Sequence, residues 1–207
     1  MSEVKLSGIS RQPTDEEYCH ERLGEAFAEA LSGYDTSRRV RVLIDDFLTD
    51  GMVRGRRILD VGCGLGFFSE RLVQRGAHVV ACDIGPSLVE KTRQRARCEA
   101  VVADAMRLLD YFDPNAFDGV VSSECIEHLP EPLVALAQMV EVVRPNGFLS
   151  ISTPNLLWYP VVRLATILGL RPFDGHEHFS TWRSLRRALA TAGRSEEHTS
   201  ELQSHHP

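Results

Sequence analysis

The chain has 207 residues, of which 43% are hydrophobic and 25% charged, and its formal net charge is -6 at pH 7. A chain of this length and composition can bury the core of one globular α/β domain. The acidic balance argues against a general nucleic-acid-binding protein, because contacts with phosphates need a basic face.

Signals for export or membrane insertion are not found. The N-terminus lacks the basic start and apolar core that are typical of a secretory signal. The most apolar stretch, 156–170, is shorter than a bilayer span and is interrupted by Pro160 and Arg163. Five cysteines form no C-x-x-C pair, which favours reduced thiols that pack in the interior. We therefore expect a cytoplasmic protein without a transmembrane helix.

The end of the chain differs from the rest. The stretch RSEEHTSELQS at 194–204 resembles the in-frame translation of a common sequencing adapter, and it has no apolar period that would give it a fold. We expect residues 194–207 to be non-native; a natural polar tail is the alternative. Ala192 and Gly193 are typical of a helix end that precedes another strand, so we expect a domain that is cut short.

Two amphipathic helices are predicted first, because apolar residues recur at helical spacing from Leu23 to Leu31 and from Val40 to Leu48. From Arg57 onward, short apolar runs alternate with helical segments; the expected strands lie in RILDVG, HVVACD, EAVVAD, FDGVVSS and GFLSIST. Such alternation predicts a parallel sheet covered by helices on both faces. Ligands of such sheets bind beyond the carboxyl ends of the strands.

We expect three segments: a helical cap at 1–55, the α/β domain at 56–193 with an inserted lid at about 155–179, and the tail. The lid contains too many apolar residues for a solvent-exposed loop at 156–170. Core packing is the preferred explanation, while a greasy acceptor and peripheral contact with a membrane surface stay open.

A glycine-rich turn follows the first predicted strand. Asp60, Gly62, Gly64 and Gly66 form the pattern D-x-G-x-G-x-G between an apolar strand and a helix. Glycines allow the backbone to turn tightly and to approach a ligand closely. Asp83 ends the next strand, where a carboxylate commonly accepts ribose hydroxyls, and Asp104 follows the third strand. Three strand ends would thus converge on one nucleoside.

Several motifs follow one another in a familiar order: LDVGCGLG, ACDIGPSLVEKTR, ADA, FDGVVSSECIEHLPEP and VVRPNGFLSISTPN. From about Arg56 to Gly193 the chain resembles the class I S-adenosylmethionine-dependent methyltransferases, and in outline the ubiquinone-pathway O-methyltransferases. The resemblance implies a Rossmann-like, doubly wound, mostly parallel sheet with strand order 3-2-1-4-5, in which the final two of seven strands are missing by truncation.

The resemblance also implies roles for individual residues around the cofactor. Asp60 and the turn from Gly62 through Cys63 and Gly64 to Gly66 would hold the methionine end. The remaining assignments are Asp83 to the ribose, Ile84 to the adenine face, Asp104 and Ala105 to the adenine edge, Ser123 to closure of the site, and Arg41 to the cofactor carboxylate.

A second cluster follows the fourth predicted strand. Glu124, Glu127 and His128 would lie on one side of a helical turn that begins at Glu124. With His176 or His178 from the lid, they would suit a divalent cation such as Mg²⁺ or Zn²⁺, which lowers the pKa of a phenol or hydroxyl. The alternative is a site without metal, in which His128 is the general base.

The function expected from these features is methyl transfer to a small-molecule acceptor, at an oxygen of a phenol, a lipid-linked molecule or a sugar, with Glu127 and His128 as the catalytic residues. One alternative is a scaffold that binds S-adenosylmethionine without turnover. The other is a nicotinamide-dependent oxidoreductase, which is disfavoured because its G-x-G-x-x-G motif places the third glycine one residue later than Gly66.

Overall fold

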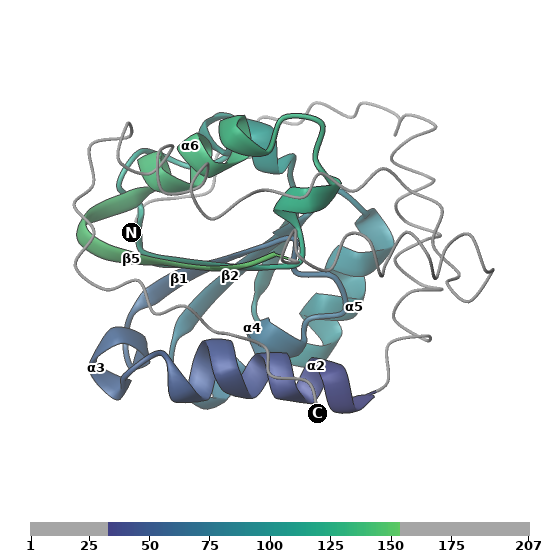
Figure 1. Ribbon diagram of the computed structural model, residues 1–207, viewed down its shortest axis with the longest axis vertical. Helices are drawn as coiled ribbons and strands as arrows, with labels where there is room; N and C mark the ends of the chain where they lie inside the picture. The colour runs from purple at the N-terminus through teal and green to yellow at the C-terminus, as the bar shows by residue number, and fades with distance from the viewer. Residues whose placement is uncertain (1–32, 154–207) are drawn as a thin grey trace, which may run out of the picture.

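The computed structural model describes residues 33–153 (Figure 1). Several sequence predictions lie outside the described residues: the helix from Leu23 to Leu31, the lid at about 155–179 with His176, the final helix and the tail at 194–207. None of the described helices is long and apolar enough to cross a bilayer.

Five parallel strands form one sheet in the order β3-β2-β1-β4-β5, which confirms the predicted 3-2-1-4-5 arrangement. The strands are β1 (Arg57–Val61), β2 (His78–Asp83), β3 (Glu99–Val102), β4 (Phe117–Ser123) and β5 (Val143–Ser152). The chain proceeds outward from β1 through β2 to β3, and then returns to the other side of β1 for β4 and β5. The carboxyl ends of β1 and β4 therefore flank the point where the winding reverses, which is where such sheets bind ligands.

Helices cover both faces of the sheet (Figure 1). One face carries α2 (Gly33–Val40), its continuation η1 (Arg41–Asp46), α4 (Phe67–Gln74) and α5 (Pro86–Ala96). The other carries the 3-10 segment η2 (Ala105–Asp110) and α6 (Pro132–Val142), which contact each other. Two short segments complete the described fold, α3 (Asp50–Val53) before β1 and η3 (Ile126–His128) after β4.

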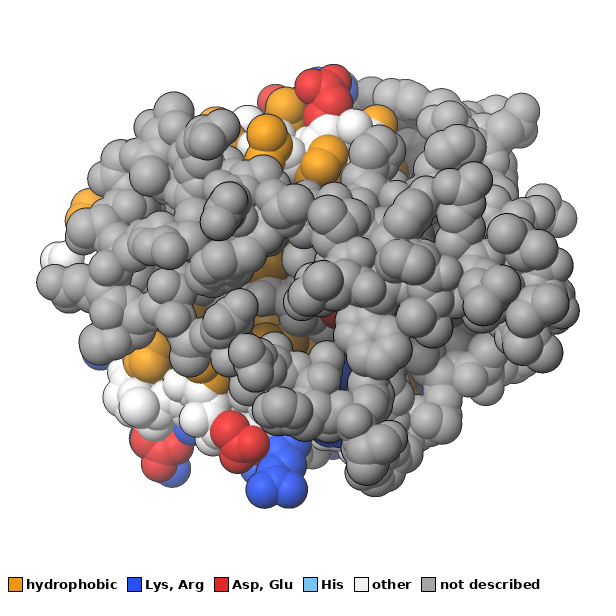
Figure 2. All heavy atoms as spheres, in the orientation of Figure 1, with side chains coloured by type: hydrophobic (Ala, Val, Ile, Leu, Met, Phe, Trp, Pro, Cys, Tyr) orange, Lys and Arg blue, Asp and Glu red, His pale blue; other side chains and the backbone are white. Residues whose placement is uncertain are grey.

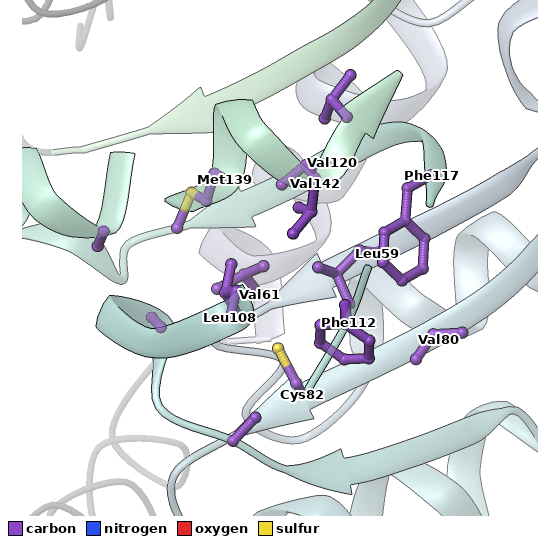
Figure 3. Packing of buried hydrophobic residues seen from close by; sticks show 14 of the residues in the cluster. Leu59, Val61, Val80, Cys82, Leu108, Phe112, Phe117, Val120, Met139 and Val142 are labelled. Carbon is purple, nitrogen blue, oxygen red and sulfur yellow. The ribbon is translucent and has the colours of Figure 1, made fainter. Parts of the chain in front are cut away.

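Side chains of each central strand alternate between two cores. Leu59 and Val61 of β1 pack with Leu108, Met139 and Val142 on the η2 and α6 face (Figure 3). Ile58, which points to the opposite face, packs with side chains of η1 and α4 in the second core. Because both faces of the strands are buried, their sequences read as continuous apolar runs rather than as alternating ones.

Charged side chains are visible at the lower edge of the view, near α2 and α3, and hydrophobic side chains reach the surface near α6 beside an acidic one (Figure 2). On α6, Leu133 and Val134 are exposed.

The predicted helix from Val40 to Leu48 is present but begins earlier. It starts at Gly33 as α2 and continues from Arg41 as the π-helical η1, which buries Leu43 and Ile44. Its C-terminal end is held by Arg75, which lies just after α4. The Arg75 guanidinium donates hydrogen bonds to the carbonyl oxygens of Ile44 and Leu48, the latter at 2.8 Å. Carbonyls at the end of a helix have no hydrogen-bond donor within the helix, and Arg75 supplies donors for two of them.

We predict that Arg75→Ala destabilises the fold by about 2 kcal/mol, because hydrogen bonds from a mostly buried cation to backbone carbonyls contribute roughly 1.5–3 kcal/mol. Urea denaturation followed by circular dichroism measures this loss. Arg71→Ala is the matched control, since Arg71 pairs with Asp45 at 2.8 Å but its side chain is 40% exposed, against 12% for Arg75. The control should cost no more than about 1 kcal/mol. Equal losses in the two variants would contradict a specific role for Arg75.

Candidate active site

The glycine turn links β1 to α4 and has a backbone that only glycines adopt easily. Gly62, Gly64 and Gly66 have positive φ angles of 72°, 51° and 80°. A Cβ on Gly66 would lie 2.9 Å from the Cα of Thr92, so a side chain is also excluded there by close packing against α5. A Cβ on Gly64 would meet nothing within 4 Å, which leaves open space beside the turn for a ligand.

Asp60 lies beneath this turn and is buried, with 2% of its surface exposed. Its Oδ2 accepts a hydrogen bond from the Ser69 hydroxyl of α4 at 2.5 Å. Burial raises the pKa of Asp60 to about 6, the neighbouring Asp83 charge adds to the rise, and the Ser69 hydrogen bond opposes it. The carboxyl of Asp60 is therefore held against α4, where burial makes its charged form less stable than it would be in water.

Asp83 connects the ends of three strands. Its Oδ2 accepts the N–H of Gly64 at 3.0 Å, and its Oδ1 accepts the N–H of Gly85 at 3.0 Å. The Asp83 carbonyl accepts the N–H of Ala103, the residue after β3, at 2.9 Å. One residue thus ties the glycine turn to the ends of β2 and β3.

The other predicted contacts of a nucleoside lie at the same rim. Ile84 follows Asp83 and is half-buried. Asp104 caps η2, since its Oδ1 accepts the N–H of Met106 at 2.8 Å, and Ala105 behind it is buried. The predicted convergence of residues 62, 83 and 104 on one rim is therefore present in the structure.

Arg41 is placed differently. It lies at the start of η1 with 75% of its side chain exposed, and its Nε is 3.6 Å from an oxygen of Asp46. No contact of the described residues supports the predicted role of Arg41 at the cofactor carboxylate, which stays a prediction.

The carboxyl ends of β4 and β5 are joined by a polar cluster of Ser123, Glu124 and Ser152. The Ser123 and Ser152 hydroxyls are 2.9 Å apart, and the Ser152 hydroxyl donates to Oε1 of Glu124 at 2.9 Å. The Glu124 N–H donates to the Ser152 carbonyl at 3.0 Å. Ser123, predicted to close the cofactor site, therefore meets β5 at this rim.

The helical turn predicted to begin at Glu124 is not present. Glu124 has a left-handed φ of 51°, and the helical turn begins only at Ile126, so the three side chains do not share one helical face. Among residues 33–153, no group of three or more His, Cys, Asp or Glu side chains could hold a metal ion. Glu124, Glu127 and His128 therefore do not form such a group by themselves; the predicted ligand His176 lies outside the described residues, and the divalent cation stays a prediction.

The structure does bring Glu127 and His128 together. An oxygen of Glu127, which is only 1% exposed, lies 3.8 Å from Nε2 of the half-buried His128. A buried carboxylate beside an imidazole can orient the ring and stabilise its protonated form. Both residues belong to η3, which begins three residues after the end of β4.

Sequence reasoning missed the residues that hold the turn from outside the motif. Ser69 bonds Asp60, Thr92 donates to the Gly64 carbonyl at 2.9 Å, and Cys125 occupies the space in which a Gly62 side chain would stand. The available signal is a polar residue inside the apolar stripe of a helix, which applies to Ser69 and Thr92 because both are fully buried.

Comparisons with known proteins agree with this geometry. A family model described as a methyltransferase domain matches residues 59–151. The ubiquinone biosynthesis O-methyltransferase of Hahella chejuensis is 31% identical over 166 residues, which cover 76% of this chain and 70% of that protein. This chain belongs to the S-adenosylmethionine-dependent methyltransferases.

Further relatives of this methyltransferase differ in how much of their length it spans. The ubiquinone biosynthesis O-methyltransferase of Xanthomonas campestris is 37% identical over 105 residues, 49% of this chain and 44% of that protein. The structure of an S-adenosylmethionine-dependent methyltransferase from Archaeoglobus fulgidus superposes with a TM-score of 0.64 at 22% identity, covering 87% of this chain and 74% of that one. This likeness confirms the fold.

We predict that the pH dependence of stability in this methyltransferase contains a component from Asp60. Since its pKa is about 6 in the folded state and 3.8 in the reference state, the folded protein binds the extra proton, and the resulting stabilisation is complete below about pH 4 and lost as the pH rises through 6. Asp60→Asn keeps an acceptor for Ser69 without the charge. Between pH 5 and 7.5, the free energy of unfolding of the wild type should fall relative to the variant by about 1 kcal/mol.

Urea denaturation at several pH values measures this difference. A difference between wild type and Asp60→Asn that stays constant from pH 5 to 7.5 would show that Asp60 does not titrate in this range.

Proposed function

We propose that this methyltransferase transfers the methyl group of S-adenosylmethionine to an oxygen of a phenol-type small molecule. The observation that carries the proposal is the shared rim: the Asp83-bound glycine turn and the Glu127–His128 pair both stand at the carboxyl ends of neighbouring strands. The relatives named ubiquinone biosynthesis O-methyltransferase support transfer to oxygen.

The residues of the turn suit the cofactor. The space beside Gly64 accommodates a ligand against the backbone. The Asp83 carboxylate, which accepts the N–H groups of Gly64 and Gly85, ends β2 at the position where a carboxylate commonly accepts ribose hydroxyls. Asp60, Asp83 and Asp104 give this rim a negative character that favours a cationic cofactor. Ile84 and Ala105 supply apolar surface for adenine.

S-adenosylmethionine supplies a methyl group that the acceptor oxygen attacks in line, with S-adenosylhomocysteine as the leaving group. The protein has to hold the two reactants in contact and to take up the acceptor proton. We assign the proton to His128, whose Nε2 lies beside the buried Glu127 carboxylate. Glu127 would orient the imidazole and stabilise its charged form.

The acceptor is inferred to be neutral. Glu124, Glu127 and Asp83 bring several carboxyl groups to the rim, and like charge disfavours an anionic substrate by repulsion. A phenolic hydroxyl meets this condition and carries the proton that His128 would remove. Transfer to a lipid-linked or sugar hydroxyl is the alternative acceptor chemistry.

The first experiment measures binding and turnover separately. Labelled S-adenosylmethionine should bind the full chain, and catechols should be methylated in preference to sugars and simple lipids. His128→Ala should lower kcat by about 10²–10⁴-fold while the Kd of S-adenosylmethionine stays unchanged. Asp83→Ala should instead raise that Kd by roughly 10–100-fold, because each hydrogen bond to a charged group contributes about 1.5–3 kcal/mol.

Tight binding without turnover on any acceptor would favour the scaffold that binds S-adenosylmethionine without catalysis. Cofactor binding that is unchanged in Asp83→Ala would remove the ribose assignment.

The divalent cation predicted from the sequence is tested on its own. A cation that activates the acceptor oxygen requires that turnover falls after dialysis against EDTA and returns with Mg²⁺, while binding of S-adenosylmethionine persists. Turnover that survives exhaustive chelation leaves the Glu127–His128 pair to act on the acceptor alone.

A cytoplasmic location, the three-segment organisation at 1–55, 56–193 and 194–207, and peripheral membrane contact through 156–170 remain predictions of the sequence.

A further inference from the structure

Ser152, the last residue of β5, contacts Glu124 at two points. The Glu124 N–H donates to the Ser152 carbonyl at 3.0 Å, and the Ser152 hydroxyl donates to Glu124 Oε1 at 2.9 Å. Backbone and side chain of one residue are therefore both bound by one partner across the β4–β5 rim. We call these two hydrogen bonds the Ser152 clamp.

The hydrogen bonds of the cluster have a defined direction. Ser152 has one hydroxyl proton, which it donates to the Glu124 carboxylate, so the hydroxyl of Ser123 must be the donor in the 2.9 Å contact with Ser152. Ser123 and Ser152 also face each other in the β4–β5 register. The resulting chain runs from Ser123 through Ser152 to the Glu124 carboxylate.

Glu124 has a backbone that its own residue type does not favour. Its φ of 51° lies in the left-handed region, which non-glycine residues other than Asn and Asp seldom enter. Such conformations persist where the surroundings impose them, and they concentrate at functional sites. The Ser152 clamp acts on both the backbone and the carboxylate of Glu124.

A second serine on the same strand shows that this pairing is specific. Ser150 lies two residues earlier on β5, on the same face as Ser152, and is 3% exposed. Its hydroxyl has no hydrogen-bond partner among the described residues. A hydroxyl in this part of β5 is therefore not bound by default, and only the one at the rim reaches a carboxylate.

We propose that Ser152 is a positioning residue, and that the Ser152 clamp fixes the Glu124 carboxylate where it accepts a hydrogen bond from the acceptor hydroxyl. The inference rests on the proposed function, because it assumes that the acceptor binds at the end of β4. Glu124 and His128 then divide the work: Glu124 orients the acceptor, and His128 removes its proton.

The test compares Ser152→Ala with two matched variants of the full chain. Ser152→Ala should lower kcat by about 10–100-fold and raise the KM of the catechol acceptor, because displacement of an orienting group by about 1 Å has effects of this size. The Kd of S-adenosylmethionine should not change. Ser152→Thr, which keeps the hydroxyl, should stay within about threefold of wild type. Ser150→Ala, the same substitution at the unbonded serine, should have wild-type kinetics.

A double-mutant cycle separates positioning from a merely structural effect. Glu124→Gln removes the charge that Ser152 holds, and should itself reduce kcat. In the Glu124→Gln background, Ser152→Ala should have little further effect, because the group that it positions is already impaired. Losses that multiply in the double variant would overturn the proposal.

The remaining outcomes are also decisive. Wild-type kinetics of Ser152→Ala on an active enzyme would overturn the role of Ser152 and leave the proposed function intact. No turnover by the wild type on any acceptor would instead contradict the proposed function. If Ser152→Ala unfolds, which thermal denaturation detects, Ser152→Cys replaces it in the cycle, since a thiol keeps a donor at this position but donates a weaker hydrogen bond.

Discussion

The carboxylate of Asp83 is the contact on which the organisation of the rim depends. It accepts the N–H of Gly64 with one oxygen and that of Gly85 with the other, so a single side chain joins the turn after β1 to the turn after β2. Both turns follow the carboxyl ends of strands that are neighbours in the sheet. The carbonyl of Asp83 also accepts the N–H of Ala103, so the same residue contacts the segment between β3 and η2. The loops that follow β1, β2 and β3 are therefore already held in place before a cofactor binds.

Preorganisation of this kind has an energetic cost, which is visible at Asp60. A carboxyl that is 98% shielded from water, next to a second acid, is less stable when charged, and its raised pKa records that cost. A methyltransferase gains from the arrangement when a cationic ligand approaches, because the charge that destabilises the empty fold then attracts the ligand. The hydrogen bond from Ser69 limits the penalty in the meantime.

The sequence predicts the fold well and the active site in part. Strand order and the glycine turn follow from local signals, namely apolar runs, helical periods and glycines at fixed spacing, and these signals leave few arrangements open. The relation of Glu124 to Glu127 and His128 is not predictable in this way. Helical spacing assumes a helix from Glu124, whereas Ser152, nearly thirty residues later, binds Glu124 in a left-handed conformation. A contact of this separation leaves no trace in the local pattern, and neither do Thr92 and Cys125 around the turn.

The attachment of the N-terminal helix has an evolutionary consequence. Arg75 donates hydrogen bonds to the backbone carbonyls of Ile44 and Leu48. Every amino acid has such a carbonyl, so these hydrogen bonds do not depend on which side chains stand at the two positions. The exposed positions of α2 and η1 can therefore diverge between homologues while the anchor is retained. Substitutions at these exposed positions can change the surface of the segment, while the hydrogen bonds from Arg75 still hold it to the rest of the enzyme.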